Sequence, residues 1–408
     1  MITEKISENV IGGKELRDII TSSLSGLDLS GKKVLAIIPD STRTAPVWLF
    51  YKTICEALGA TAKELGFLIA LGTHPPMTEE QIDKLLRREG RSCPVFNHRW
   101  DQPSQLKTIG KISAAEIEET TGGLFSEEIT VNVNKLIFDY DHLLLIAPTF
   151  PHEVVGFSGG NKYFFPGISG PEVLNFFHWL GAVITNPEIN GTRYTPVRAV
   201  VDKAASMITI PKTCFSMVIQ GDGVKGIFVG APEEAYDSAA ELSSRLHIIY
   251  KDRPFKKILS MAPEMYDDIW TAGKCMYKLE PVVADGGELI IYAPHVTEVS
   301  YSHGKILDVI GYHVRDYFLK QMEKFEGIPR GVMAHSTHVK GTGTFEDGIE
   351  KPRVNVILAT SIPEERCRKI NLGYMNPRDI NPGDWEGREA EGVLAVPRAG
   401  EMLYRLKK

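Results

Sequence analysis

The chain has 408 residues, 43% of them hydrophobic and 24% charged, so it can bury a large core, and its length predicts two or three domains. The formal net charge is -6, and lysine and arginine form no long basic run. This pattern argues against a nucleic-acid or anionic-membrane surface and leaves small molecules as the expected partners. The polar start, with no apolar stretch of roughly 20 residues, predicts a cytoplasmic protein. Five scattered cysteines without a CxxC pair predict neither a disulfide framework nor a thiolate zinc site.

Short apolar runs at the start of the chain predict buried parallel strands. Residues 34–38 and 65–71 are two such runs, and the segment between them, residues 48–58, has helical spacing. Residues 143–147 repeat the pattern of an apolar strand that ends in polar residues. The sequence therefore predicts an α/β fold with a mainly parallel sheet.

Polar side chains follow each of these predicted strands. Asp40 and Arg43 come after the first, His74 after the second and His152 after the third. In open α/β sheets, ligands bind beyond the carboxyl ends of the strands, so all four residues are expected near one site. Taken alone, Arg43 allows two interpretations. Its planar guanidinium could bind a carboxylate or a phosphate, or the residue could lie at the surface in a helix-capping turn. His74 alone is either a proton carrier or a structural histidine.

A glycine-rich loop over residues 151–170 surrounds Lys162. Glycines allow close approach of a bound group, and a lysine there can contact a phosphate or, once deprotonated, act as a nucleophile. His152 and His178 flank the loop without the H-E-x-x-H spacing of a protein-only zinc site. A single histidine could still hold a metal whose other ligands belong to a cofactor.

A second α/β region is expected after a boundary near residue 252. Residues 257–260 and 288–292 are predicted strands, residues 267–282 a helix, and residues 285–287 a turn.

Two further polar features leave alternatives open. The stretch 221–226 fits the pattern GxGxxG, but strand-like residues follow it, so a hairpin is favoured over a nucleotide site. Histidines and hydroxyl groups in residues 294–295, 302–304 and 335–343, among them His303, His335 and His338, are expected in loops after strands, where they either line a pocket for a polar substrate or bond to the backbone.

Taken in order, four motifs resemble the lactate racemase family of nickel-dependent 2-hydroxyacid racemases and epimerases. They are Asp40-x-x-Arg43-x-x-Pro46, Gly72-Thr73-His74, Pro148-x-x-Pro151-His152 with the loop that contains Gly159, Gly160, Asn161 and Lys162, and His178. With this resemblance we expect two α/β domains with mainly parallel sheets and an active-site cleft between them. Residues 1–252 would carry the cofactor-binding and catalytic motifs, and residues 253–408 would close over the substrate.

The resemblance also implies a cofactor, a nickel-pincer nucleotide (nickel pyridinium-3,5-bisthiocarboxylic acid mononucleotide), and therefore a partner machinery that makes it. Lys162 would join this cofactor through a thioamide, and His178 would bind the nickel. The remaining roles implied by the motifs are cofactor binding by Asp40, Gly159, Gly160 and Asn161, substrate-carboxylate binding by Arg43, acid/base chemistry by His74 and His152, and substrate contact by Lys274.

The predicted function is racemisation or 2-epimerisation of a 2-hydroxy acid by reversible hydride transfer from C2 through a 2-keto acid. Two imidazoles with pKa values near neutrality suit such a reversible reaction. Trp270 and Thr271 stand where lactate enzymes typically have Tyr and Gln, which favours a substrate larger or more polar than lactate, such as a sugar acid. The alternatives are an NAD-dependent 2-hydroxyacid dehydrogenase and a non-catalytic protein that binds a metabolite or cofactor.

Overall fold

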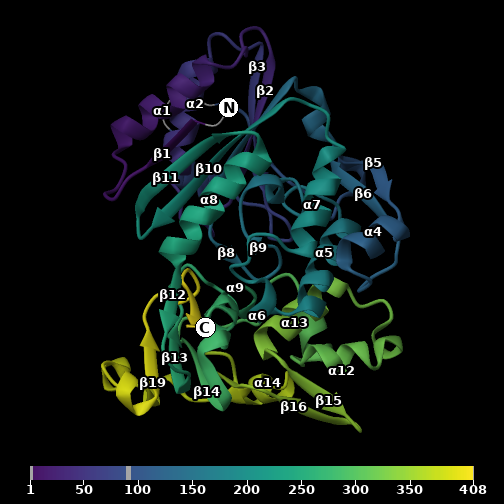
Figure 1. Ribbon diagram of the computed structural model, residues 1–408, viewed down its shortest axis with the longest axis vertical. Helices are drawn as coiled ribbons and strands as arrows, with labels where there is room; N and C mark the ends of the chain where they lie inside the picture. The colour runs from purple at the N-terminus through teal and green to yellow at the C-terminus, as the bar shows by residue number, and fades with distance from the viewer. Residues whose placement is uncertain (1–2, 89–92, 408) are drawn as a thin grey trace. The chain divides into compact units, whose positions relative to one another are not determined.

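The computed structural model describes residues 3–88 and 93–407 of an α/β protein (Figure 1). The chain forms two compact units, each built from more than one segment. The first comprises Met1–Phe150, Phe157–Leu174 and Arg193–Leu246, and the second comprises Pro151–Gly156, Asn175–Thr192 and His247–Lys408. The expected domains were continuous stretches, whereas these units exchange short segments of the chain. Within the described ranges, no helix has the length and apolar character needed to cross a bilayer.

The first unit is built on a seven-stranded sheet of order β1-β11-β10-β7-β2-β3-β4. Its strands are β1 (Thr3–Ile6), β2 (Lys33–Pro39), β3 (Glu64–Ala70), β4 (Val95–Asn97), β7 (His142–Pro148), β10 (Lys212–Gln220) and β11 (Gly223–Gly230). The five strands from β10 to β4 run parallel, and β11 and β1 continue the sheet antiparallel. The three predicted strands in this part of the chain are therefore confirmed.

Helices of the first unit cover this sheet with apolar faces. They are α1 (Gly13–Ser25), α2 (Val47–Leu58), α3 (Glu79–Leu86), α4 (Ala114–Thr121), α7 (Pro196–Ser206) and α8 (Pro232–His247), and α5 (Pro171–Ile184) begins in this unit. α1 and α2 pack side by side against one face of the sheet, where Ile20, Phe50 and Ile54 are fully buried (Figure 1). α3 begins with the predicted capping box of Thr78 and Gln81.

Two antiparallel strand pairs belong to this unit. One joins β5 (Leu106–Ile112) to β6 (Ile129–Asn134). The other joins β10 to β11 across Gly221 and Asp222, with Gln220 opposite Gly223. No helix opens at the end of the GxGxxG stretch, because residues 223–230 form β11. The hairpin is confirmed, and the stretch lacks the helix N-terminus that holds a pyrophosphate in dinucleotide sites.

The second unit contains a five-stranded parallel sheet of order β18-β17-β14-β13-β19. Its strands are β13 (Phe255–Met261), β14 (Val283–Ala293), β17 (Asn355–Thr360), β18 (Gly373–Tyr374) and β19 (Val393–Val396). Short pairs are formed by β12 (Ile248–Lys251) with β20 (Leu403–Leu406), by β15 (Gly343–Glu346) with β16 (Ile349–Pro352), and by β8 (Pro151–His152) with β9 (Gly156–Phe157). Both predicted strands of this region are present. The turn expected over residues 285–287 is instead a bulge inside β14, where Gly286 has φ 71°.

Short helices dominate the second unit: α6 (Asn186–Ile189), α9 (Ile269–Ala272), α10 (Lys274–Tyr277), α11 (Gly304–Ile310), α12 (Arg315–Leu319), α13 (Arg330–Lys340) and α14 (Glu364–Lys369). The single helix predicted over residues 267–282 was wrong. It is broken at Gly273, where a Cβ atom would lie 2.7 Å from Val339 Cγ2, so a glycine lets the chain approach α13. Pro281, in the 3-10 turn Glu280–Val282, has no backbone N–H to continue the helix.

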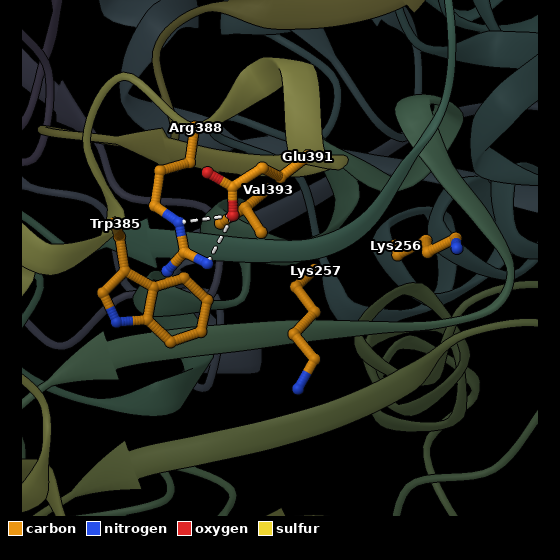
Figure 2. Close-up of a pocket in the computed structure, with 6 residues that line it drawn as sticks. All are labelled: Lys256, Lys257, Trp385, Arg388, Glu391 and Val393. Carbon is orange, nitrogen blue, oxygen red and sulfur yellow. Dashed lines mark hydrogen bonds and ion pairs between the residues drawn. The ribbon is translucent and has the colours of Figure 1, made fainter.

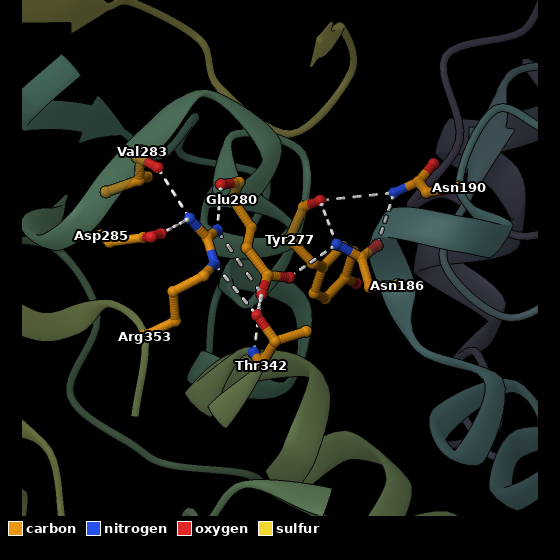
Figure 3. A network of polar contacts seen from close by, with 8 residues as sticks. All are labelled: Asn186, Asn190, Tyr277, Glu280, Val283, Asp285, Thr342 and Arg353. Atoms are coloured by element: carbon orange, nitrogen blue, oxygen red, sulfur yellow. Dashed lines mark hydrogen bonds and ion pairs between the residues drawn. The ribbon is translucent and has the colours of Figure 1, made fainter. Parts of the chain in front are cut away.

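The buried carboxylate of Glu280 connects α6 to the rest of the second unit through hydrogen bonds (Figure 3). The Glu280 side chain is fully buried, and its Oε2 accepts a hydrogen bond of 2.9 Å from Asn186 Nδ2. Its Oε1 accepts from the backbone N and the hydroxyl of Thr342, at 2.7 and 3.0 Å. Arg353 donates to the Glu280 carbonyl oxygen at 2.6 Å. Two residues distant from each other in sequence, Asn186 and Thr342, thus share one acidic side chain.

Candidate active site

In the first unit, the residues predicted to follow β2 and β3 meet at the same edge of the sheet. His74 Nδ1 lies 2.5 Å from Asp40 Oδ2. The Arg43 guanidinium lies 5.3 Å from the centroid of the Phe150 ring, and Phe150 follows β7. Because β2 lies between β3 and β7, the polar residues after neighbouring strand ends come together.

The Asp40 carboxylate fixes the hydrogen on the His74 ring. Asp40 is 5% exposed, and its Oδ1 accepts from the backbone N and the hydroxyl of Thr42 at 3.0 and 2.6 Å. Burial alone would raise the pKa of Asp40, but His74, Arg43 and the Thr42 hydroxyl outweigh it and hold this pKa well below its usual range. Since the carboxylate is ionised, Nδ1 of His74 carries the hydrogen and Nε2 presents a lone pair. His74 is therefore arranged to accept a proton at Nε2.

This pair predicts a specific acid dependence of stability. A depressed folded-state pKa means that Asp40 contributes its full stabilisation above its unfolded pKa of about 3.9, and loses it as the pH falls below that value. We expect the free energy of unfolding of the wild type to fall more steeply between about pH 4 and pH 2 than that of Asp40→Asn. Urea unfolding at a series of pH values measures both slopes. Equal slopes would contradict the low pKa of Asp40.

The glycines of the Lys162 loop are required by the packing of the loop itself. Gly159 and Gly160 have φ angles of 96° and 55°, which side-chain-bearing residues rarely adopt. A Cβ on Gly159 would collide with Thr149 Oγ1, and one on Gly160 would lie 2.8 Å from Tyr236 Cβ. These contacts explain both glycines without a ligand, and their predicted contact with a cofactor stays a prediction.

Polar side chains from α7 and α8 fix the same loop. Asn161 Nδ2 donates to Asp202 Oδ1 at 3.0 Å and to Glu233 Oε1 at 2.7 Å. Arg198, 3% exposed, donates to the Gly159 carbonyl oxygen at 3.3 Å. The buried Oδ1 of Asn161 has no hydrogen-bond partner in the described structure. Sequence analysis missed the two carboxylates and the arginine, since they lie 39 to 72 residues along the chain from their partners in the loop and form no local motif.

In the second unit, His152 lies in a tightly held turn. The Val154 backbone N–H donates to His152 Nδ1 at 3.1 Å, and Glu153 Oε2 lies 3.4 Å from the same nitrogen. The ammonium of Lys278, a residue only 2% exposed, donates to the Pro151 carbonyl oxygen. Neither Glu153 nor Lys278 was identified from the sequence, because a lone acid and a lone lysine carry no motif.

The helix that carries His178 packs against this turn. On α5, Gly181 comes one helical turn after His178, and a Cβ there would lie 3.0 Å from the Val154 carbonyl oxygen. The glycine lets the helix approach the backbone next to His152. The second unit therefore positions His152 and His178 on two adjoining elements.

Further imidazoles gather on α13 in the second unit. His335 and His338 are buried, 8% and 5% exposed, and lie in this helix rather than in the loop that we expected. The Trp270 ring stacks on His335 with centroids 4.1 Å apart. Burial is the main reason that the pKa values of both histidines fall, to about 4 for His338, so both are neutral at pH 7. Their spacing of three residues, which places them on one helical face, is a sequence signal that could have identified this cluster.

Thr271 and Lys274 also belong to this part of the second unit. The Thr271 hydroxyl bonds to Asp268 Oδ1 at 2.9 Å, within the cap of α9, so this departure from the lactate enzymes has a structural role. Lys274, which we predicted to contact the substrate, is half-buried with its ammonium 4.5 Å from the centroid of the Tyr266 ring.

Two measured cavities lie away from the predicted site residues. One, of 340 Å³, is in the second unit, where Arg388 is held by two hydrogen bonds to Glu391 beside Trp385 (Figure 2). The other, of 610 Å³, lies along α2 in the first unit. No residue predicted for catalysis or cofactor binding lines either cavity. Across residues 3–88 and 93–407, no three His, Cys, Asp or Glu side chains are grouped as a metal site.

The fold and this arrangement define an α/β protein with a carboxylate-bound histidine and an arginine at the carboxyl end of a parallel sheet. Residues 3–190 match the model of the family described as the lactate racemase N-terminal domain. This part of the chain is therefore similar to the lactate racemase family, and the resemblance predicted from the motifs is confirmed. The lactate racemase of Thermoanaerobacterium thermosaccharolyticum is 26% identical over 314 residues, which cover 74% of this chain and 66% of that enzyme.

Solved structures confirm the α/β fold along nearly the whole chain. A protein from Thermotoga maritima superposes with a TM-score of 0.91 and 36% identity, and the match covers 99% of this chain and 100% of that one. The lactate racemase apoprotein from T. thermosaccharolyticum superposes with a TM-score of 0.73 and 18% identity, over 98% and 94% of the two chains.

Proposed function

We propose that this protein is a racemase or 2-epimerase of 2-hydroxy acids that uses a nickel-pincer nucleotide. The observation that carries the proposal is the Asp40–His74 pair, which leaves the Nε2 lone pair of an imidazole available to a substrate hydroxyl. The similarity of the N-terminal part to the lactate racemase family supports the reaction class. Arg43, three residues after Asp40, supplies a planar cation that suits the substrate carboxylate.

In this proposal each side chain binds the substrate or moves a proton. The Arg43 guanidinium holds the carboxylate, and His74 Nε2 takes the proton of the C2 hydroxyl of one enantiomer. His152 does the same for the other enantiomer, so that each imidazole acts as a base in one direction and as an acid in the reverse. Lys274 contacts the substrate. The cofactor, when bound, supplies an acceptor for the C2 hydride.

The residues of the Lys162 loop fit a bound cofactor. Lys162 is half-buried in a loop fixed from α7 and α8, and the nearby Asn161 Oδ1 is buried without a hydrogen-bond partner in the described structure, as expected where a ligand would supply one. We propose that Lys162 joins the nucleotide and that His178 binds its nickel. Since no protein cluster offers three ligands in the described part of the chain, the cofactor would provide the others.

The surroundings of Trp270 support a substrate larger or more polar than lactate, such as a sugar acid. Trp270 packs on two imidazoles, His335 at 4.1 Å and His303 at 4.5 Å between centroids. A neutral imidazole can both donate and accept a hydrogen bond, which suits hydroxyl groups.

The test is the mass and metal content of the protein produced together with the cofactor-making machinery. We expect a covalent mass increment on Lys162 and stoichiometric nickel, and we expect both to be lost in Lys162→Ala, since that variant has no amine to form the thioamide. Lys203→Ala, which removes an exposed lysine of α7, is the matched control and should retain both. A protein that inverts C2 of a chiral 2-hydroxy acid only in the loaded form completes the evidence.

The two alternatives give different results. An NAD-dependent dehydrogenase would consume nicotinamide cofactor and show no increment, and the hairpin at residues 221–226 already argues against this reading. A non-catalytic binding protein would retain its ligand without inverting any substrate. Absence of both increment and nickel from a correctly loaded sample would contradict our proposal.

A further inference from the structure

The Nδ1 atom of His152 faces two groups of opposite polarity. The Val154 backbone N–H donates to it at 3.1 Å, and the Glu153 Oε2 atom lies 3.4 Å away. A nitrogen that accepts a hydrogen bond carries no hydrogen, so the neutral His152 ring in this structure has its hydrogen on Nε2. His74 is held in the opposite tautomer, because Asp40 keeps the hydrogen on its Nδ1.

This tautomer of His152 cannot serve directly as the acid or base of the proposed reaction. A ring that exchanges a proton at Nε2 alternates between the cation and the neutral form with its hydrogen on Nδ1. Loss of the Nε2 proton from the neutral ring seen here would leave an imidazolate, which is far too basic to form near pH 7. His152 must therefore first gain a hydrogen on Nδ1, and that hydrogen needs an acceptor.

Glu153 is an ionised acceptor at the required place. Its side chain is 16% exposed, and burial would raise its pKa, but His338, its own backbone N–H, Lys278 and Lys274 outweigh burial and lower this pKa. The lysines come from the segment around α10 and His338 from α13, so cationic and polar groups of two other elements face the carboxylate. His178 of α5 acts in turn on His338.

We propose that Glu153 is a positioning residue that converts His152 from the backbone-bonded tautomer of this structure into the Nδ1–H form that exchanges a proton at Nε2. The proton count is simple: Nδ1 takes a proton from water to give the imidazolium, whose Nδ1–H then bonds to Glu153. The proton on Nε2 can now pass to a substrate oxygen, which leaves a neutral ring with its hydrogen on Nδ1. The inference rests on the acid/base role proposed for His152.

The test is the nitrogen NMR spectrum of the histidine rings in the cofactor-free, full-length protein across a pH series. In the wild type we expect the Nε2–H tautomer of His152 at high pH and an imidazolium with a carboxylate-bound Nδ1–H at lower pH. In Glu153→Gln the midpoint of this change should fall by about one pH unit, since a neutral amide no longer stabilises the cation. Glu153→Asp should restore part of the shift, and Glu264→Gln, an exposed glutamate of the second unit, should leave it unchanged.

Two results would overturn the inference. One is an identical His152 titration in the wild type and in Glu153→Gln while the His335 signals show that the fold is intact. The other is a wild-type His152 that keeps its hydrogen on Nδ1 at every pH, since no conversion would then be needed. If the titration moves as expected but the loaded wild type inverts no 2-hydroxy acid, the pairing of Glu153 with His152 holds and the proposed function fails.

Discussion

Replacing His74 by alanine should lower kcat for C2 inversion by roughly 10²- to 10⁴-fold, the usual contribution of a general acid or base. The loss follows from the removal of an imidazole whose Nδ1 is bound to a buried carboxylate at the carboxyl end of the sheet. Chiral chromatography of a 2-hydroxy acid incubated with the nickel-loaded variant measures the rate. KM should change little, because Arg43, which we propose binds the substrate carboxylate, is unchanged.

His142→Gln is the matched control for this variant. His142 lies at the opposite, amino end of β7, where its Nε2 is 3.0 Å from Thr213 Oγ1, so its loss should leave kcat unchanged. Unchanged inversion in His74→Ala would remove His74 from the mechanism. Equal losses in both variants would point to damage of the sheet rather than of a catalytic group.

Asp40→Asn separates the two roles that can be assigned to Asp40. The sequence resemblance implies that Asp40 holds the cofactor, whereas the structure places its Oδ2 against His74 Nδ1. An asparagine can present an N–H to Nδ1 and so favour the tautomer with the hydrogen on Nε2, which cannot accept a proton there. A variant that keeps its nickel but loses turnover indicates orientation of His74, and one that loses nickel indicates cofactor binding.

What could be predicted from the sequence is what short-range patterns determine. The apolar runs before Asp40 and His74 predicted two parallel strands, and the rule that ligands bind beyond strand ends correctly predicted that these two side chains lie together. The Asp222-Gly223 pair predicted a hairpin, which the structure contains with its two turn residues one position earlier, at Gly221 and Asp222, because Gly223 already belongs to β11.

What could not be predicted depends on contacts between distant segments. Helical periodicity over residues 267–282 gave no sign of the interruption at Gly273 or of the close approach of α13 to this glycine. The hydrogen bonds from the Asn161 amide nitrogen to Asp202 and Glu233, which α7 and α8 bring to the loop, had no sequence signal either. The contact between Glu153 and His152 could not be predicted either. Adjacent residues place a carboxylate and a backbone N–H at the same ring nitrogen only in a particular turn geometry.

The largest effect on stability is expected at Glu280. Replacing it by alanine should lower the free energy of unfolding by about 3 kcal/mol or more, because its carboxylate is fully buried and its loss leaves donors on Asn186 and Thr342 without their acceptor. Urea unfolding followed by the fluorescence of the tryptophans measures this loss as a lower midpoint. Glu280→Gln should be milder, since an amide oxygen can still accept one of these hydrogen bonds.

Asp285→Ala provides the matched control, because Asp285 pairs with the same arginine in a different environment. Arg353 Nη1 lies 3.3 Å from Asp285 Oδ1, but this carboxylate is 89% exposed, and water replaces the interaction when it is removed. We therefore expect no measurable change in the unfolding midpoint of Asp285→Ala beside the large shift of Glu280→Ala. Similar shifts in both would mean that the charge of Arg353, rather than the buried acceptor for α6 and Thr342, determines the stability of this network.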